Sequence, residues 1–590
     1  TGSTPADNAT GLFIDNSNGT ASTVNINVYD LVQSGLGKKS YGYFFKDVDT
    51  LNYTNTNGSN AITLDDGSIF DATNGNVHNT QDLTSVGNGA IGIYQKGGTI
   101  TNAGKLDFTT GTKNTALYTT TGTATNQSAG TINVGTSNFG MVTIGGSIIN
   151  DGKINITANK GTGMYSSSSN VTTNNGLITA ATGITDAVGI YGKSVNNTSS
   201  GKITVGDGSI AIYTNDGNVT NSGNITVGKN KAIGVLAIGT NQNIALNGNI
   251  SISNDSFGLV NKGSGNSIIS NVSNTALGTD AVFIYQNDNT GTIINNTSVI
   301  STGDRNYGLY GNGTMTNNGI IDFSTGNGNV GIYSTGGTAR NYGDIKVGAS
   351  NTAAKEYGVG MATGYYDDNP SSPTYDQSFN QGIIENHGTI EVSKPNTMGM
   401  YAVGAGSKAI NYGYINLTGS ETIGMYIDRG AEGENWGTIQ TTANGLTKVK
   451  GVYVANGGYI KNYGVINIAA SDLKSAGIWT DNVDNAEEDA TGTNPLTGGV
   501  QTGTSNPGIK VVTADDMKSM GGITIKVPPR MTPPTVTDAQ GNIIPIYKVD
   551  TDIAAPVPRS VIVTSPTGAT SIDLAASNFL NYTSSSEATS

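Results

Sequence analysis

Short hydrophobic segments recur along most of the chain and are separated by polar turns. A typical segment reads aliphatic, glycine, aliphatic, tyrosine, as in Ile91-Gly92-Ile93-Tyr94 and Val330-Gly331-Ile332-Tyr333. The residues alternate at a period of two, without a helical period, so each segment predicts a β-strand. The segments return roughly every 24 residues, which indicates an internal structural repeat.

A second phrase recurs about 8–12 residues after the hydrophobic segments and reads Asn-x-Gly-x-Ile/Leu. Examples are Asn102-Ala103-Gly104-Lys105-Leu106 and Asn341-Tyr342-Gly343-Asp344-Ile345. Three short strands and three turns fit into a repeat of about 24 residues, which is one coil of a parallel β-helix. We therefore predict an all-β, right-handed parallel β-helix of about 19 coils, the hand following from the crossover rule for parallel strands.

Stacking of the coils predicts where the repeated side chains lie. Alternation places the two aliphatic residues of the first phrase inside, and the glycine and tyrosine outside. The fourth position then forms a column of mostly aromatic side chains, in which we also place Phe70 and Gly360. Asparagine and glycine tolerate the positive φ of tight corners. Stacked asparagine side chains are expected to hydrogen-bond from coil to coil.

The composition changes near residue 483, where an acidic stretch begins and after which most of the 14 prolines lie. We predict that residues 1–482 form the β-helix and that residues 483–590 form a proline-rich β cap or a small β domain. The repeat is interrupted once more, between about residues 361 and 381, by an inserted loop.

The composition excludes several classes of chemistry. The chain has no cysteine, which removes thiolate metal sites and disulfides, and only two histidines, His78 and His387. The net charge of −13 argues against nucleic-acid binding. No apolar run approaches the ~18 residues of a membrane helix. The chain starts Thr1-Gly2 without a signal peptide, so we expect an excised piece of a longer protein.

The phrases Tyr307-Gly308-Leu309-Tyr310, Gly399-Met400-Tyr401 and Asn411-Tyr412-Gly413-Tyr414-Ile415 resemble repeats of large type V (Va) autotransporter adhesins of the fusobacterial kind. The segment from Ser571 to Tyr582 is similar to stretches that follow their β-helix blocks. The resemblance implies an exported passenger at the bacterial cell surface, attached to the outer membrane only through a barrel domain outside this chain. It implies host cell-surface glycans, host protein receptors or partner bacteria as binding partners.

Two groups of residues are candidates for ligand binding. A long loop on a rigid scaffold is a common place for recognition, and the insertion supplies Tyr365, Tyr366, Asp367, Asp368 and Tyr375. The middle position of Asn-x-Gly becomes aromatic in the later coils, at Tyr342, His387, Tyr412, Trp436 and Tyr463. If the coils align, these five form one exposed column, which suits glycan or protein contact. Ladder packing and a loop without a role are the alternatives, with a calcium site at Asp367, Asp368 and Asn369 a weaker one.

The sequence thus favours a non-enzymatic adhesin that presents loops and aromatic columns, with no catalytic residue, metal or cofactor expected. A structural spacer that carries a distal adhesive tip is one alternative. A β-helical polysaccharide lyase or hydrolase is another, because such enzymes share the fold and need clustered carboxylates. Adjacent pairs such as Asp65-Asp66 would point to opposite faces of a strand, which disfavours that alternative.

Overall fold

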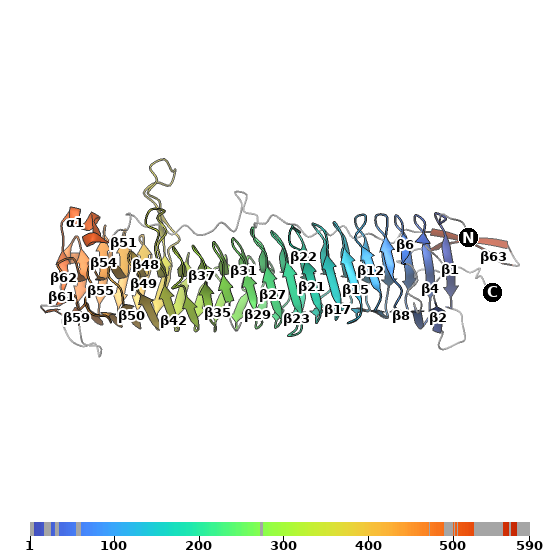
Figure 1. Cartoon of the computed structure of the whole chain (residues 1–590), viewed down its shortest axis with the longest axis horizontal. Helices are drawn as coiled ribbons and strands as arrows, with labels where there is room; N and C mark the ends of the chain where they lie inside the picture. Colours follow the sequence, from blue (N-terminus) through green and yellow to red (C-terminus); the bar gives the residue numbers. More distant parts are fainter. Residues whose placement is uncertain are drawn as a thin grey trace. The chain divides into compact units, whose positions relative to one another are not determined.

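The computed structural model describes residues 5–16, 25–29, 35–54, 61–271, 275–470, 472–488, 499–500, 502–503, 506–523, 559–565 and 568–574. It is a parallel β-solenoid of about 18 turns with almost no helix, consistent with the predicted right-handed parallel β-helix (Figure 1). The chain divides into two compact units. The first unit contains residues 1–235 and 542–590, and the second contains residues 236–541.

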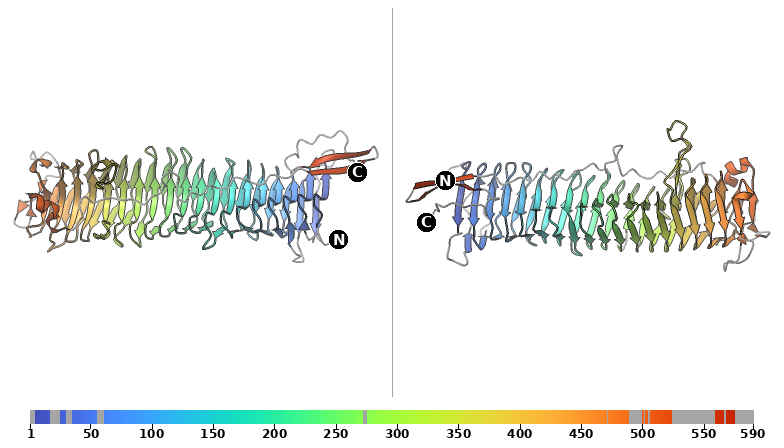
Figure 2. Two further views of the ribbon diagram at one scale, coloured as in Figure 1. Left: turned by 90° about the horizontal axis from the view of Figure 1, so that it is seen from above. Right: turned by 180° about the vertical axis from the view of Figure 1, so that it is seen from behind.

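Each coil contributes one strand to each of three sheets, which we name sheets A, B and C. In the first unit, one coil consists of β10 (Ile91–Gln95), β11 (Thr99–Asn102) and β12 (Lys105–Phe108). These strands pair in parallel with β13 (Thr115–Thr119), β14 (Thr123–Asn126) and β15 (Thr131–Val134) of the next coil. The second unit repeats this arrangement, for example in β40 (Val330–Ser334), β41 (Thr338–Asn341) and β42 (Asp344–Val347) (Figure 2).

The strands of sheet A depart from simple alternation at their glycine. A Cβ atom on Gly92 would lie 3.1 Å from the inward-facing Phe108 ring, so the glycine faces the interior. Ile91 and Tyr94 belong to one hydrophobic cluster, and the pairing of β10 with β13 omits Gly92. The predictions that Gly92 faces outward and that Ile91 and Ile93 share the inner face are therefore wrong. The glycine is needed because a Cβ there would approach the Ala116 carbonyl oxygen of the next coil to 2.4 Å.

Two positions of the predicted fourth-position column are also corrected. Strand pairing aligns Phe44 with Ala72 and Tyr94, so Ala72 rather than Phe70 occupies the column. It likewise aligns Tyr333 with Ala362 and Tyr401, so Gly360 is displaced by Ala362. Both errors have the same cause. Where an alanine occupies the column, the sequence pattern does not show which residue of the strand is aligned with the aromatic residues of the neighbouring coils.

Asparagine ladders run inside the corner between sheets B and C, as predicted. The side chains are at most 1% exposed. Each Nδ2 donates to the Oδ1 of the asparagine in the next coil, over 2.7–3.0 Å. The ladder of the first unit comprises Asn79, Asn102, Asn126, Asn150, Asn174, Asn197 and Asn221. That of the second unit comprises Asn295, Asn317, Asn341, Asn386, Asn411, Asn435 and Asn462.

The solenoid continues beyond the composition change at residue 483. Strands β58 (Ala486–Glu488), β59 (Gly499–Val500) and β62 (Ile509–Val511) pair in parallel with β55 (Tyr459–Asn462), β56 (Val465–Asn467) and β57 (Ala476–Thr480). The short helices α1 (Ala514–Lys518) and η2 (Met520–Gly522) follow. Strands β63 (Arg559–Ser565) and β64 (Gly568–Leu574) form an antiparallel hairpin, and most of residues 524–590 lie outside the described residues.

Helices α1 and η2 pack against sheet A over a buried lysine. Lys450 in β54 (Lys450–Ala455) is 0% exposed, and its Nζ donates to the carbonyl oxygens of Lys474 at 2.6 Å and of Gly521 at 3.4 Å. The ammonium lies 4.6 Å from the centre of the Trp479 ring. Burial lowers the pKa of Lys450 to about 7, while Asp472 opposes this shift and the nearby lysines, including Lys448, add to it.

We expect the docking of α1 and η2 to strengthen as the pH rises from 7 to 9. The Lys450 ammonium loses its proton near pH 7 when docked, but only near 10.5 when exposed, so undocking takes up a proton in this window. Each pH unit should therefore disfavour undocking by up to about tenfold. Thiol labelling of Met517→Cys, relative to Leu473→Cys, measures this, since Met517 is buried and Leu473 is 89% exposed. An unchanged pH dependence in Lys450→Met would contradict this explanation.

Candidate functional site

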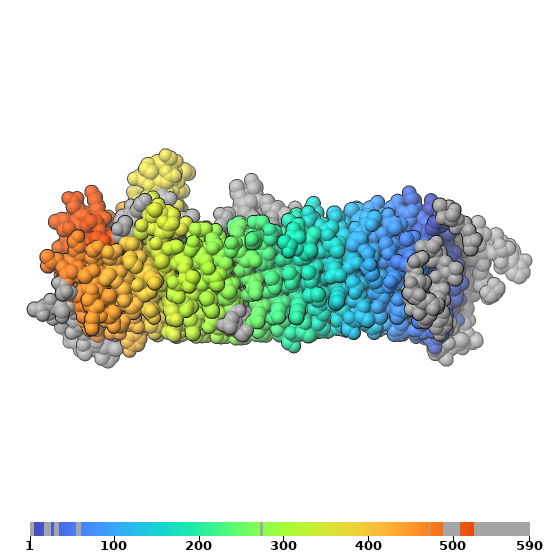
Figure 3. Space-filling model, in the orientation of Figure 1, coloured from blue at the N-terminus to red at the C-terminus, as the bar shows by residue number. Residues whose placement is uncertain are grey.

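The predicted insertion is an ordered hairpin that projects from the second unit. It connects β43 (Val359–Thr363) of sheet A with β46 (Ile383–Asn386) of sheet B. Its two strands, β44 (Tyr365–Tyr366) and β45 (Ser378–Phe379), are antiparallel. The hairpin rises above the neighbouring coils in the ribbon and in the space-filling view (Figure 1, Figure 3). We call residues 364–380 the projecting hairpin.

Asp367 holds the tip of the projecting hairpin together. Its backbone N–H donates to the carbonyl of Gln377 at 3.0 Å, and its carbonyl accepts from the N–H of Asp376 at 2.8 Å. Its carboxylate accepts from the N–H of Asn369 at 3.0 Å and from the hydroxyl of Thr374 at 2.7 Å. Asp367 is 4% exposed, so its carboxylate serves the hairpin's own turn.

Tyr366 fastens the base of the projecting hairpin to the solenoid. Its ring lies 4.4 Å from the guanidinium carbon of Arg429, which follows β51 (Thr422–Asp428). Its hydroxyl donates to Asp376, and burial together with this hydrogen bond raises the pKa of Tyr366. A cation over an aromatic face contributes about 0.5–2 kcal/mol. The two elements held together are far apart in sequence, which restrains the hairpin's orientation.

The five predicted residues of the insertion therefore have different roles: some stabilise the hairpin and others are accessible to a ligand. Tyr366 and Asp367 are buried, while Tyr365 and Asp368 are half-buried. The Tyr365 ring lies 6.4 Å from that of Phe379 across the two strands. Tyr375 alone of the five is exposed, at 49%, and it sits at the tip beside exposed prolines. Tyr375 is thus the member of this group best placed to contact a ligand.

The second predicted group does form one column, at the corner between sheets B and C of the second unit. The centroid distances between neighbouring rings of the column are 4.6, 4.7, 6.5 and 4.2 Å, with interplanar angles of 17–24°. In order, the rings belong to Tyr342, His387, Tyr412, Trp436 and Tyr463. We call them the aromatic column.

The stacking limits what the aromatic column can bind. Face-to-face neighbours cover each other's ring faces, so the column presents mainly ring edges and hydroxyl groups to solvent. A sugar that stacks on an aromatic ring needs an open face, which the interior of the column offers least. Tyr342, at one end, is 52% exposed and Tyr412 is 43% exposed. The arrangement therefore suits contact along its edges better than a continuous rail for sugar rings.

Carboxylates orient the two ring N–H groups of the column. Glu385 Oε2 lies 3.3 Å from His387 Nε2 and 2.8 Å from Arg340 Nε. Glu434 Oε2 accepts from Trp436 Nε1 at 2.9 Å, and Glu434 Oε1 lies 2.6 Å from Lys408 Nζ. These partners lower the pKa of Glu434 against the opposing effect of its burial. Both carboxylates thus have a cation beside them and fix a ring of the column.

The projecting hairpin and the aromatic column lie at different corners of the coil. The hairpin connects sheet A to sheet B, whereas the column follows the last residue of the sheet B strands. The strand β46, of four residues, separates the two corners within one coil. The structure thus provides two separate candidate surfaces.

Sequence reasoning missed an amide ladder that continues the aromatic column toward the N-terminus. In the preceding coils of the second unit the same corner position holds Asn247, Asn271, Asn296 and Asn318. Each later side-chain amide donates to the one before it, at 2.8–3.0 Å. We call these four residues the outer amide ladder. Of the four, Asn318 is the middle residue of an Asn-x-Gly phrase. The other three follow the last residue of a sheet B strand in coils that lack the full phrase, so the phrase does not reveal the ladder.

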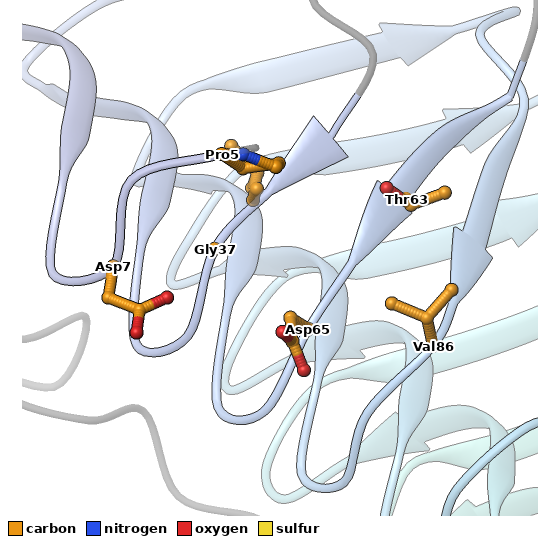
Figure 4. A pocket seen from close by; sticks show the side chains of 7 residues that line it. Pro5, Asp7, Gly37, Thr63, Asp65 and Val86 are labelled. Carbon is orange, nitrogen blue, oxygen red and sulfur yellow. The ribbon is translucent and has the colours of Figure 1, made fainter. Parts of the chain in front are cut away.

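A shallow cavity of about 490 Å³ opens at the first coils of the first unit (Figure 4). The lining residues are Pro5, Asp7, Leu36, Gly37, Thr63, Asp65 and Val86. Its two carboxylates already accept backbone N–H groups, Asp7 from Lys38 at 2.9 Å and Asp65 from Asp66 at 2.7 Å. The lining therefore offers no convergent set of uncommitted polar groups.

Within the described part of the chain, no three side chains of His, Asp or Glu gather in a way that could hold a metal ion. The suggested calcium ligands Asp367 and Asn369 are instead joined by the turn hydrogen bond of the hairpin. The described residues also contain no helix with the length and apolarity to span a membrane.

Residues 7–180 and 323–435 match the family model of the third pectate lyase-like domain of BigA, an adhesin of the autotransporter type. The chain is similar to an adhesin domain. The second matched stretch contains the projecting hairpin and three residues of the aromatic column, Tyr342, His387 and Tyr412. The match agrees with a passenger-like β-helix and a surface-exposed, adhesin-like protein, without singling out the fusobacterial group. No curated protein and no solved structure shows significant similarity to the chain.

Proposed function

We propose that this chain is part of a bacterial cell-surface adhesin and that the tip of the projecting hairpin recognises the partner. The observation that carries the proposal is a rigid hairpin that leaves an otherwise regular solenoid and presents Tyr375 at its tip. Partners of the expected kind are host glycans, host protein receptors or surfaces of other bacteria. The similarity to a domain of an autotransporter-type adhesin supports this role and a location outside the outer membrane.

The contacts that stabilise the hairpin favour a role in recognition over a loop without function. A loop without function would not need a buried carboxylate to order its turn or an arginine to hold its base. Here Asp367 and Arg429 supply both. Such preorganisation lowers the entropy lost on binding, which raises affinity. Tyrosine is enriched among the residues that contribute most to binding because it offers a large rigid surface.

Removing the tip ring should abolish most of the binding. We expect Tyr375→Ala to weaken binding at least tenfold, because truncation of a binding hot spot costs about 2 kcal/mol or more. The measurement is binding of the purified chain to an array of host glycans and host receptors. Tyr342→Ala is the matched control, because Tyr342 is the same residue type with nearly equal exposure, 52% against 49%, on the other candidate surface.

Deletion of residues 365–379 tests the whole hairpin. It preserves β43, including Ala362 and Thr363, and joins Gly364 to Asn380, whose backbones are already linked by a 3.0 Å hydrogen bond. Retained binding in this deletion, with loss in Tyr342→Ala, would move the site to the aromatic column. Retained binding in both variants would contradict recognition at either surface.

Two alternative functions, a structural spacer and a polysaccharide lyase or hydrolase, predict different experimental results. If the intact, folded chain binds nothing on the array, the spacer function is favoured. If polysaccharides incubated with the chain yield new reducing ends or unsaturated products, the chain is a lyase or hydrolase. The pectate lyase-like description of the matched domain gives the reason to include pectic substrates in that assay.

A further inference from the structure

Exposed apolar side chains gather at one corner of the second unit. Six large hydrophobic residues that are 37–53% exposed lie at or beside the corner between sheets B and C. They are Ile269, Ile300, Ile320, Tyr342, Tyr412 and Tyr414. The aromatic column and the outer amide ladder run along the same corner. We call this surface the corner stripe.

Part of the charge beside the aromatic column is paired, although the chain as a whole is acidic. The chain carries a net charge of −13, but the two carboxylates that orient rings of the column each have a cation beside them. Arg340 pairs with Glu385 at 2.8 Å, and Lys408 pairs with Glu434 at 2.6 Å. A second copy of the chain would thus meet little repulsion here, in contrast to the repulsion between acidic surfaces elsewhere.

The two halves of the corner stripe complement each other. The outer amide ladder carries carbonyl oxygens and N–H groups at the strand spacing of ~4.8 Å. The aromatic column presents ring edges, which carry partial positive charge, and tyrosine hydroxyls at the same spacing. The edges match carbonyl oxygens, and the hydroxyls match either amide group. Four amide positions precede five aromatic positions along one line.

We propose that the corner stripe is a self-association surface, on which a second copy of the chain binds antiparallel. A two-fold axis between the levels of Asn318 and Tyr342 places the outer amide ladder of each copy opposite the aromatic column of the other. An interface with two-fold symmetry requires this reciprocity, because each contact occurs twice. In cross-β assemblies, asparagine ladders and stacked aromatic rings both stabilise paired sheets at a repeat of ~4.8 Å. The inference goes beyond adhesion and does not depend on the projecting hairpin.

The absence of cysteine makes the geometry directly testable. With the axis at this place, Asn271 of one copy lies opposite Tyr412 of the other, whereas the two copies of Asn271 lie about five strand spacings, or ~24 Å, apart. A disulfide requires Cα atoms within about 7 Å. A mixture of Asn271→Cys and Tyr412→Cys chains should therefore form the mixed disulfide, and each variant alone should not crosslink.

The oligomeric state provides the second measurement. We expect the intact chain to dimerise with rising concentration, and more readily at higher salt, because salt screens the net negative charge. Tyr342→Asp, next to the proposed axis, should weaken dimerisation at least tenfold because it places two carboxylates close together. Tyr375→Asp on the projecting hairpin is the control and should leave the dimer intact. Trp436 fluorescence reports whether the aromatic column remains folded in each variant.

Homotypic crosslinking of each cysteine variant would overturn the antiparallel arrangement. A chain that stays monomeric at every concentration and salt level would overturn self-association. Loss of array binding in Tyr375→Asp without loss of the dimer would separate this surface from the adhesive one. Equal weakening of the dimer by Tyr375→Asp and Tyr342→Asp would also contradict the assignment to the corner stripe.

Discussion

Asn386→Leu is expected to destabilise the second unit by about 2–5 kcal/mol, although it exchanges side chains of similar size. The Asn386 amide donates to Asn411 Oδ1 at 2.8 Å, and its Oδ1 accepts from Asn341 Nδ2 at 2.9 Å. Leucine removes both bonds and leaves two buried amides short of a partner. Each buried polar group that loses its hydrogen bond costs about 1–3 kcal/mol.

The same substitution at Asn271 is the matched control. Asn271 also bonds to asparagines of the neighbouring coils, at 2.9–3.0 Å, but on the exposed outer amide ladder, where water can replace the lost partners. We expect a change there below about 0.5 kcal/mol. Both tryptophans of the chain, Trp436 and Trp479, lie in the second unit, so their fluorescence follows its unfolding in urea. Equal destabilisation by the two variants would contradict the importance of burial.

Asp71→Ile is expected to stabilise the first coils. Asp71 in β7 (Ile69–Thr73) is 0% exposed and pairs with Tyr43 on one side and Ile93 on the other. The rings of Tyr43 and Tyr53, 5.2 Å apart, lie near it, because burial and the Asp71 carboxyl together raise the pKa of both tyrosines. Burial raises the pKa of the Asp71 carboxyl well above its ordinary value, and a weaker effect of Tyr53 opposes this shift.

The gain from Asp71→Ile should depend on pH in a defined direction. Below about pH 3.8 the carboxyl is protonated in both the folded and unfolded states, so its ionisation adds no cost. Above that pH the unfolded chain ionises while the folded chain keeps the proton, so the wild type loses stability as the pH rises. We expect a gain of at least about 2 kcal/mol at pH 7, the scale of an uncompensated buried polar group, and a smaller gain at pH 4.

Hydrogen exchange of the amides in β7 and β10, followed by mass spectrometry at both pH values, measures this effect locally. A local measurement is best here because each coil of a solenoid contacts only its neighbours, so the change is largest in the coils around Asp71. Asp107→Ile is the control: Asp107 lies on the outer face of β12, where it pairs with Lys105 at 3.3 Å. A pH-independent gain in Asp71→Ile, or an equal gain in Asp107→Ile, would contradict the burial argument.

The architecture could be predicted from the sequence because nearly every coil repeats the same pattern of strands and turns. A period of two, Asn-x-Gly corners and a constant spacing all favour one coil type, so a single irregular coil does not obscure the fold. The details that failed are those that depend on one backbone distance. The sequence Ile91-Gly92-Ile93-Tyr94 does not show how close the next coil lies. A Cβ atom on Gly92 would lie only 2.4 Å from the carbonyl oxygen of Ala116 in that coil.

The candidate sites were predictable to different degrees. The aromatic column followed from a position that recurs in every coil, so alignment of the coils was sufficient to find it. The projecting hairpin was visible only as an interruption of the repeat. That Tyr366 and Asp367 would be buried depends on Arg429 and Thr374, partners that the spacing does not reveal. Lys450 was missed because its partners are backbone carbonyls, which have no sequence signature.

The buried asparagine ladders have a direction, and this bears on the order in which coils form. Every Nδ2 donates toward the C-terminal neighbour, so a growing stack ends differently at its two ends. When a stack grows toward the N-terminus, the asparagine of its last coil has an unpaired side-chain carbonyl. When it grows toward the C-terminus, that asparagine has an unpaired side-chain N–H. Buried carbonyls tolerate a missing partner better than buried N–H groups. Assembly of the solenoid from its C-terminal coils toward its N-terminal coils is therefore the less costly direction.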